Sequence, residues 1–349
     1  MNLMVNELPS ITWNRLGMNR AMVSLEGEYR NHTPEADFDE TQIFWNPSAE
    51  VSLEGLHGDL EPIVVNAAIG FGETAPGIQM EFPLALAYAY AEGEKAVSHL
   101  SLHAGEESRL QALLILTGDA ETSAIQTEIL ADDNAVVDIY VAQLLGSRSL
   151  SLFNIAASCG QNAKINLVKL ELGAGKTYAG AAVDLKGTES SFDTRIGYHV
   201  KPGQLLDMNY VALHHGRRTE SNMEVNGTLE EGARKTFRGT IDFQQGCAGA
   251  KGTENENVML MGDEMVNQTI PLILCKEEDV EGNHGASIGQ LDEKVLFYLA
   301  SRGMSREAAQ AMIAQARIDA ICELFPLEQV RTQVRDFENA RGISHGEEC

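Results

Sequence analysis

The sequence predicts a mainly β body followed by a small helical C-terminal region. Between Ala96 and Leu274, short apolar runs alternate with polar residues at a period of two, and glycines separate the runs. Aromatic residues make up only 6% of the chain and glycine is frequent at 32 residues, which favours turn-rich β structure over a helical bundle. From Leu291 onward the apolar residues change to helical spacing, so the β body is expected to end just before this point.

The first 75 residues predict short strands and loops before the main body. Alternating pieces between Thr41 and Ala68 are separated by glycine and proline turns. The segment Leu8–Asn14 is either an arm that anchors through Trp13 or a stretch that packs its one large aromatic side chain. The segment Phe82–Ala91 fits either a helix or a strand.

Two β architectures compete for the body. One is an antiparallel sandwich or barrel, and the other is a parallel β-helix in which each coil contributes two or three short strands. The glycine spacing shows no clean repeat, so spacing alone leaves both open. The scarcity of two-residue hairpin signals favours the β-helix slightly.

The stretch Asn267–Ser305 joins the two regions. Ile270–Leu274 reads as a buried strand, and an acidic turn at Glu277–Asp279 follows. Glycines around His284 predict that this histidine lies in a sharp polar turn. Three helices are expected beyond it: the first runs from Leu291 to Ser301, Ser305 caps the second, and Pro326 starts the third.

Charge and targeting signals narrow the function. A nucleic-acid binder normally carries a basic surface, so the net charge of −25 argues against that function. An anionic membrane surface would also repel so acidic a chain. No apolar run approaches the roughly 18 residues that a membrane-spanning helix needs. The N-terminus lacks a secretory signal pattern, so a cytoplasmic location is expected.

The sequence predicts no enzyme. Five scattered cysteines form no Cys-x-x-Cys pair, which argues against a disulfide framework, a zinc site or a ferredoxin-type site. Each cysteine more often serves as a small buried hydrophobe. The chain also lacks a Walker A motif, so it is not expected to hydrolyse ATP itself.

Several ordered motifs resemble the SufB/SufD family of iron–sulfur cluster assembly proteins. The longest runs from Glu278 to Glu293 and continues through Leu296–Leu299 and Ser301–Gly303, and further matches lie at His214–Gly216, Lys235–Gly239 and Asn257–Asp263. The resemblance implies a right-handed parallel β-helix core at residues 76–286. It also implies a C-terminal helical domain at residues 287–349 that docks a SufC-type ABC ATPase, after an N-terminal segment at residues 1–75 that is reduced relative to larger members.

The resemblance also implies metal-site residues. His284-Gly285 matches the SufD branch, in which this histidine is implicated at the subunit interface where the nascent cluster forms. The SufB branch has a glutamate in place of Gly285 and a cysteine in place of Glu256. We therefore expect His284 and Cys275 as metal ligands, with Glu256 as a further cofactor-binding residue. The expected cargo is a transient iron–sulfur cluster, with no permanently bound cofactor.

The partners implied are the SufC-type ATPase, a SufB/SufD-family subunit or a second copy of this chain, and a cysteine desulfurase system as the sulfur source. The residues expected to bind the ATPase are Asp292, Phe297, Tyr298 and Arg302. Alternatively, Phe297 and Tyr298 simply pack the first helix onto the β body. Two further alternatives are an adaptor that never touches metal and a β-helix enzyme acting on a polysaccharide. The enzyme is disfavoured because such enzymes usually line the substrate groove with Lys and Arg, whereas this chain has only 26 of these residues and 51 Asp and Glu.

Overall fold

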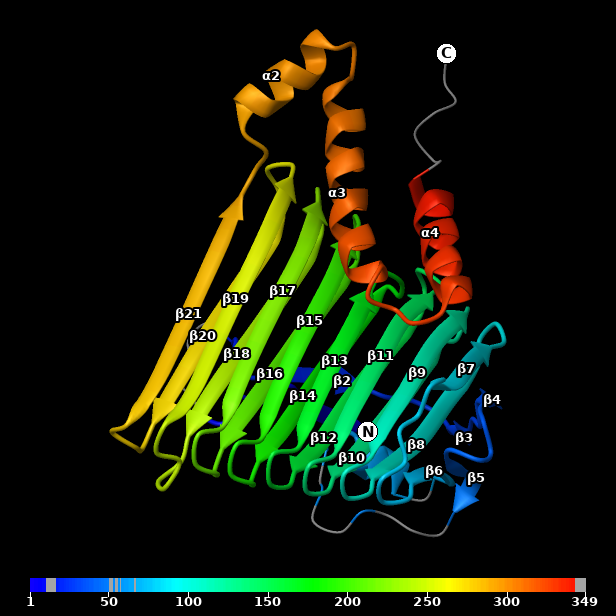
Figure 1. Ribbon diagram of the computed structural model, residues 1–349. Coiled ribbons are helices and arrows are strands. Elements are labelled where there is room, and N and C mark those ends of the chain that lie inside the picture. The colour runs from blue at the N-terminus through cyan, green and yellow to red at the C-terminus, as the bar shows by residue number, and fades with distance from the viewer. Residues whose placement is uncertain (11–16, 50–52, 54–55, 57, 66, 343–349) are drawn as a thin grey trace.

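The protein is a parallel β-solenoid with helices at its C-terminal side (Figure 1). The computed structural model describes residues 1–342 except 11–16, 50–52, 54–55, 57 and 66. Trp13 and Cys349 lie outside the described residues. The prediction of a parallel β-helix core followed by C-terminal helices is confirmed, and the sandwich alternative is wrong.

Two sheets face each other across one apolar core, and successive strands of the body alternate between them. The larger sheet contains β3 (Arg30–Asn31), β5 (Phe44–Ala49), β6 (Ile69–Thr74), β8 (Lys95–Ala104), β10 (Thr122–Ala131), β12 (Leu150–Cys159), β14 (Lys176–Leu185), β16 (Leu205–His214), β18 (Arg234–Phe243) and β20 (Val266–Cys275). The smaller sheet contains β4 (Glu35–Asp37), β7 (Leu84–Tyr90), β9 (Arg109–Gly118), β11 (Val136–Leu145), β13 (Lys164–Glu171), β15 (Ser191–Val200), β17 (Glu220–Glu230), β19 (Ala250–Met261) and β21 (Val280–Gly289).

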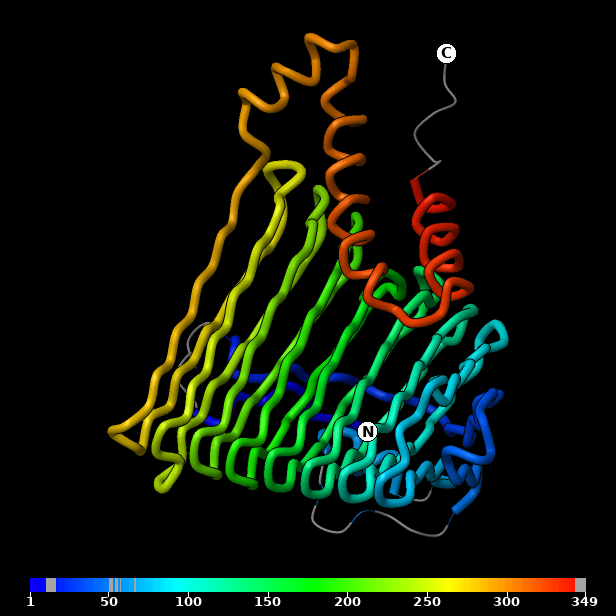
Figure 2. The backbone as a smooth tube through the Cα atoms, viewed as in Figure 1, coloured from blue at the N-terminus to red at the C-terminus, as the bar shows by residue number. Residues whose placement is uncertain are grey.

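In-register stacking explains the period-two pattern in the sequence. Along each strand every second side chain points between the sheets, and residues paired on neighbouring strands form rows along the solenoid. One such inward-facing row runs through Ile139, Leu167, Thr194 and Met223, all of them buried. The tube in Figure 2 shows how regularly the coils repeat. The ambiguous segment at Phe82–Ala91 is a strand, because β7 continues these rows.

The two ends of the solenoid differ. At the N-terminal end, β4 and β5 pair antiparallel with β7 and β6 and cover their edges. At the other end, β20 pairs only with β18, and β21 pairs only with β19. We call the coil formed by β20 and β21 the open end. Its backbone edge is available for further pairing in the chain as described.

The N-terminal segment crosses the outer face of the larger sheet, as the dark blue part of the tube behind the solenoid shows in Figure 2. It contains β1 (Asn2–Val5) and β2 (Ala21–Ser24), and α1 (Glu61–Val64) packs on the same face. The Asn6 amide donates to the Asp207 carboxylate at 2.6 Å, and Arg238 donates to the Met18 carbonyl at 2.7 Å. These bonds fasten the segment across β16 and β18.

Three helices follow the solenoid: α2 (Glu293–Ser301), α3 (Arg306–Cys322) and α4 (Glu328–Gly342). The predicted Ser305 cap is confirmed, since its side chain accepts from the Ala308 amide. The last turns of α3 and the first half of α4 pack against the outer face of the smaller sheet around Leu170 and Phe325. By contrast, α2 projects beyond the strands (Figure 1). No helix among the described residues has the length and apolarity required to cross a membrane.

Candidate functional site

His284 lies within strand β21, so the prediction of a histidine in a sharp turn is wrong. Its flanking glycines lie in close packing contacts and not in a turn, and neither has a positive φ. A Cβ on Gly282 would approach Ile273 and Phe243 to 3.1 Å, and one on Gly285 would approach the Asn255 side-chain oxygen to 2.8 Å. The acidic segment before β21 does form the connection from β20.

The imidazole of His284 is available for a ligand. It is exposed at the open end, and it has no hydrogen-bond or ion-pair partner among the described residues. The other described histidines all have one. His32, His99, His103, His199 and His215 each contact a carboxylate, and His214 contacts Thr219 and Ser221.

Cys275 also lies at the open end, as the last residue of β20 and in register with Phe243. Its thiol is exposed and donates to the Glu277 carbonyl at 3.0 Å. His284 stands four residues beyond the start of β21, about 13 Å along the strand at the usual rise per residue. The structure therefore places the thiol at the turn and the imidazole well along the strand. Cys159, Cys247 and Cys322 are buried, as expected for small hydrophobes.

Glu256 lies inside the solenoid, with its side chain fully buried. Its carboxylate pairs with Lys235 and accepts hydrogen bonds from Tyr198 at 3.2 Å and Thr269 at 2.5 Å. Both carboxylate oxygens are thus occupied by residues of the chain. Burial lowers the pKa of Lys235, although Glu256 opposes this shift.

Glu254 is the residue that sequence reasoning missed. It is buried on β19, in register with His284 on β21, and both belong to the same inward-facing row. Burial, together with the neighbouring charge of Glu256, raises the pKa of Glu254 to about 7. The only sequence signal was its alternation with Glu256, which places two acids on one side of a strand.

The residues predicted to bind the ATPase lie on or beside α2. Phe297 is 77% exposed and Tyr298 is 55% exposed, so the alternative that they pack α2 onto the β body is wrong. The Arg302 guanidinium stacks on Tyr298, with 5.1 Å between its Cζ and the ring centroid. Asp292 caps α2 by accepting from the Lys294 amide at 2.8 Å. Phe297, Tyr298 and Arg302 thus form a projecting apolar and cationic surface.

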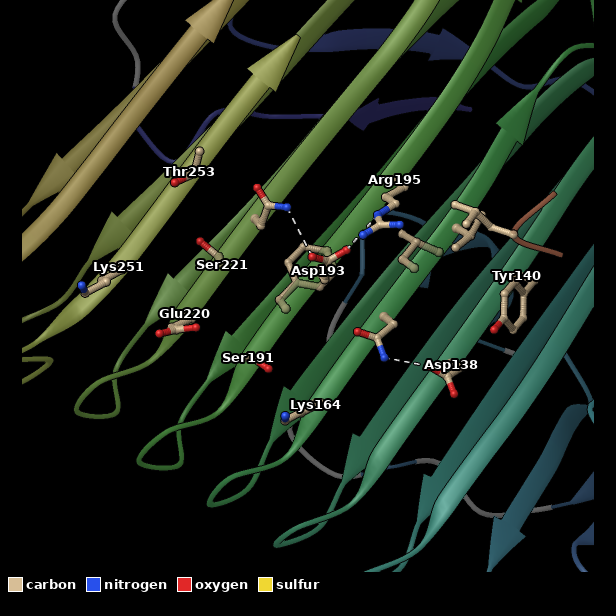
Figure 3. A pocket seen from close by; sticks show the side chains of 16 residues that line it. Asp138, Tyr140, Lys164, Ser191, Asp193, Arg195, Glu220, Ser221, Lys251 and Thr253 are labelled. Atoms are coloured by element: carbon tan, nitrogen blue, oxygen red, sulfur yellow. Dashed lines mark hydrogen bonds and ion pairs between the residues drawn. The ribbon is translucent and has the colours of Figure 1, made fainter. Parts of the chain in front are cut away.

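A groove of about 700 Å³ opens on the outer face of the smaller sheet (Figure 3). Its three carboxylates, Asp138, Asp193 and Glu220, are balanced by Lys164, Arg195 and Lys251. Asn166 donates to Asp138 at 2.7 Å, and Arg109 pairs with the same carboxylate. Asn222 donates to Asp193 at 3.3 Å. Asp138 and Asp193 are therefore held by neighbours, which is unlike the free pair of carboxylates that hydrolyses a glycosidic bond.

These features define a class of protein: a parallel β-solenoid whose last coil has a free backbone edge and which carries a projecting helix. The chain belongs to the SufBD family, since the family model described as "SUF system FeS cluster assembly, SufBD core domain" matches residues 88–317. Relatives in this family carry the description of iron–sulfur cluster assembly proteins.

Three relatives illustrate the similarity. The chain is 24% identical to the iron–sulfur cluster assembly protein SufD of Bacillus subtilis over 291 residues. This aligned segment covers 82% of this chain and 65% of the relative. It is 26% identical over 170 residues to SufB of the same organism, covering 49% of this chain and 37% of the relative. A chloroplastic SufBD family protein of Arabidopsis thaliana is 29% identical over 163 residues, covering 47% and 28%. The chain thus matches at most 65% of the length of these relatives.

Proposed function

We propose that this chain is a dimeric scaffold on which iron–sulfur clusters are assembled, with iron bound at His284. The observation that carries the proposal is the open end. It combines two strands whose outer edges pair with no described strand and an exposed histidine that has no partner among the described residues. A second subunit, either another copy or a SufB/SufD-type partner, pairs with this edge and encloses the imidazole.

Unpaired edge strands support the dimer. A long exposed edge invites pairing with another chain, and the opposite end of this solenoid is covered by antiparallel strands. Two apolar side chains, Val266 and Ile288, are exposed on the same terminal coil. Burial of these groups against a partner would add an apolar contact to the backbone pairing.

In this proposal α2 docks a SufC-type ABC ATPase through Phe297, Tyr298 and Arg302. Large aromatic and arginine side chains are the commonest anchors of protein interfaces. ATP-driven movement of the docked ATPase would then act on the open end through the link from β21 to α2. The chain itself performs no catalytic step, acts in the cytosol and receives sulfur from a cysteine desulfurase system.

Metal binding distinguishes this scaffold from a simple adaptor for the ATPase. The chain would be purified anaerobically with its ATPase, supplied with iron and sulfide, and examined by visible absorption and iron content. We expect a chromophore that is lost in His284→Ala while the ATPase stays bound. A matched control is His215→Ala, because His215 is exposed but already paired with Asp184. An unchanged chromophore in His284→Ala would refute the proposed iron site.

A further inference from the structure

The inward-facing row that ends in His284 contains a second ionisable residue one coil earlier. Glu254 on β19 pairs in register with His284 on β21. Neighbouring strands lie about 4.8 Å apart, so side chains in one row are direct neighbours. The carboxylate of Glu254 and the imidazole of His284 therefore belong to the same side of the same two strands.

Glu254 is buried without a full set of partners. Only 1% of the residue is exposed, and its Oε2 atom has no hydrogen-bond donor among the described residues. The neighbouring cation Lys235 donates to Glu256 and to Thr269 instead. Burying an acceptor without a donor is costly, so a carboxylate in this state is suited to accept a cation.

The opposite wall makes room for this carboxylate. A Cβ on Gly239 of β18 would come within 2.4 Å of the Glu254 carboxyl carbon. The Glu254 carboxylate thus occupies the space that a side chain at position 239 would fill. It lies inside the solenoid, one coil before the open end.

Small residues flank His284 on the inward face of β21. Along this face His284 stands between Gly282 and Ala286, which pair in register with Gly252 and Glu256 of β19. Neither neighbour carries a functional group. The His284 imidazole is therefore the ligating side chain that this face of β21 places next to Glu254 of β19.

We propose that Glu254 and His284 together bind a single ferrous ion at the open end. This inference rests on the proposed function and adds a second ligand to it. A carboxylate and an imidazole suit a divalent iron ion, whereas clusters are held mainly by thiolates. The pair therefore selects the iron ion itself as the species that first occupies the site.

Two protein ligands leave most of the coordination sphere open. No group of three metal-ligating side chains occurs within the described part of the chain. The remaining positions would be filled by water and by groups that a second subunit brings to the open end. Iron held in this way stays accessible to incoming sulfide.

The test uses Co²⁺ as an air-stable probe of the full chain without added sulfide. Calorimetry and visible absorption would follow the titration. We expect one Co²⁺ per chain, with weak visible bands and no thiolate charge-transfer band. Glu254→Gln and His284→Ala should each weaken binding at least tenfold. The matched control is Glu281→Gln, an exposed acid on the same strand that pairs with Lys251 at 3.4 Å.

Three outcomes would overturn the inference: no binding by the wild-type chain, unchanged affinity in Glu254→Gln, or a strong thiolate band. Thermal melting of each variant checks that it is folded, and His284→Ala changes only an exposed side chain. The scaffold proposal fails separately, if cluster reconstitution is unchanged in His284→Ala. Loss of the cluster in His284→Ala with normal Co²⁺ affinity in Glu254→Gln would reject Glu254 alone.

Discussion

The Nδ1 atom of His199 lies 2.7 Å from Oε2 of Glu338, and this contact ties α4 to the rim of the solenoid. The other ring nitrogen of His199 lies 2.8 Å from Glu230 on β17. Arg341 of α4 and Lys201 beyond β15 also face this cluster. Burial opposes the charged imidazole, but the hydrogen bonds and charges of both glutamates raise the pKa of His199.

This arrangement predicts that docking of α4 depends on pH. The pKa of His199 is raised in the folded chain. The stabilisation that His199 gives to α4 docking is therefore fully present below about pH 6.5, the ordinary pKa of histidine, and is lost as the pH rises through the pKa that His199 has in the folded chain. The pKa values of Glu230 and Glu338 are lowered, since the contacts with His199 outweigh burial. The stabilisation of α4 docking by these two glutamates is present above about pH 4.3 and is lost as the pH falls through their lowered pKa values.

Amide hydrogen exchange along α4 would measure this dependence. Protection should be greatest between about pH 4.5 and 6.5 after correction for the intrinsic exchange rate, and should fall toward higher pH. His199→Gln should lower the protection and remove most of the decline. A corrected protection that is flat with pH in the wild-type chain would contradict this role of His199.

A second prediction concerns the buried pair Lys235–Glu256. Lys235→Met leaves the Glu256 carboxylate buried without its cation, so we expect a loss of about 3–5 kcal/mol in the free energy of unfolding. The double variant Lys235→Met/Glu256→Leu should recover most of this loss, because no buried charge remains. Urea unfolding measures both. A single variant as stable as the wild type would show that the ion pair is not needed inside the solenoid.

The third prediction concerns α2. Replacing Phe297 and Tyr298 by serine should weaken ATPase binding by about 30-fold or more, since aromatic anchors often contribute at least 2 kcal/mol. The melting temperature should stay unchanged because both rings are exposed. Met312→Ser on α3 is the matched control, as this exposed apolar residue lies outside the proposed surface. Equal affinity of the α2 variant and the control would place the docking surface elsewhere.

The fourth prediction concerns the open end. Ile288→Asp introduces a charge on the exposed terminal strand and should raise the dissociation constant of the dimer at least tenfold. Light scattering over a concentration series would follow the change in mass. Met22→Asp, at an exposed position on β2, should leave the dimer intact. Equal masses for the two variants would argue against pairing through this end.

The sequence was sufficient to predict the strands, because the two-residue alternation directly reflects side chains that point in and out of the solenoid. It was insufficient for the pairing of β19 with β21. The residues in register differ in type from coil to coil, as Met223, Glu254 and His284 do in a single row. Without a visible repeat, the neighbour of His284 could not be inferred.

The same limit explains the error about His284 itself. Glycine serves both in turns and where backbone or side chains approach closely, and local sequence does not distinguish the two uses. Here Gly282 faces Ile273 and Phe243 from the opposite sheet, a contact that only the folded coil creates. The buried pairing of Glu256 depends likewise on Lys235, which lies on the opposite sheet.

The central claim is that His284 ligates iron at the open end. The most direct measurement is pulsed electron paramagnetic resonance of the reduced, reconstituted complex that contains isotopically labelled histidine. We predict a nitrogen coupling of a coordinated imidazole in the wild type and in His215→Ala, and its loss in His284→Ala. A wild-type spectrum without nitrogen coupling, or the same coupling in His284→Ala, would contradict the claim.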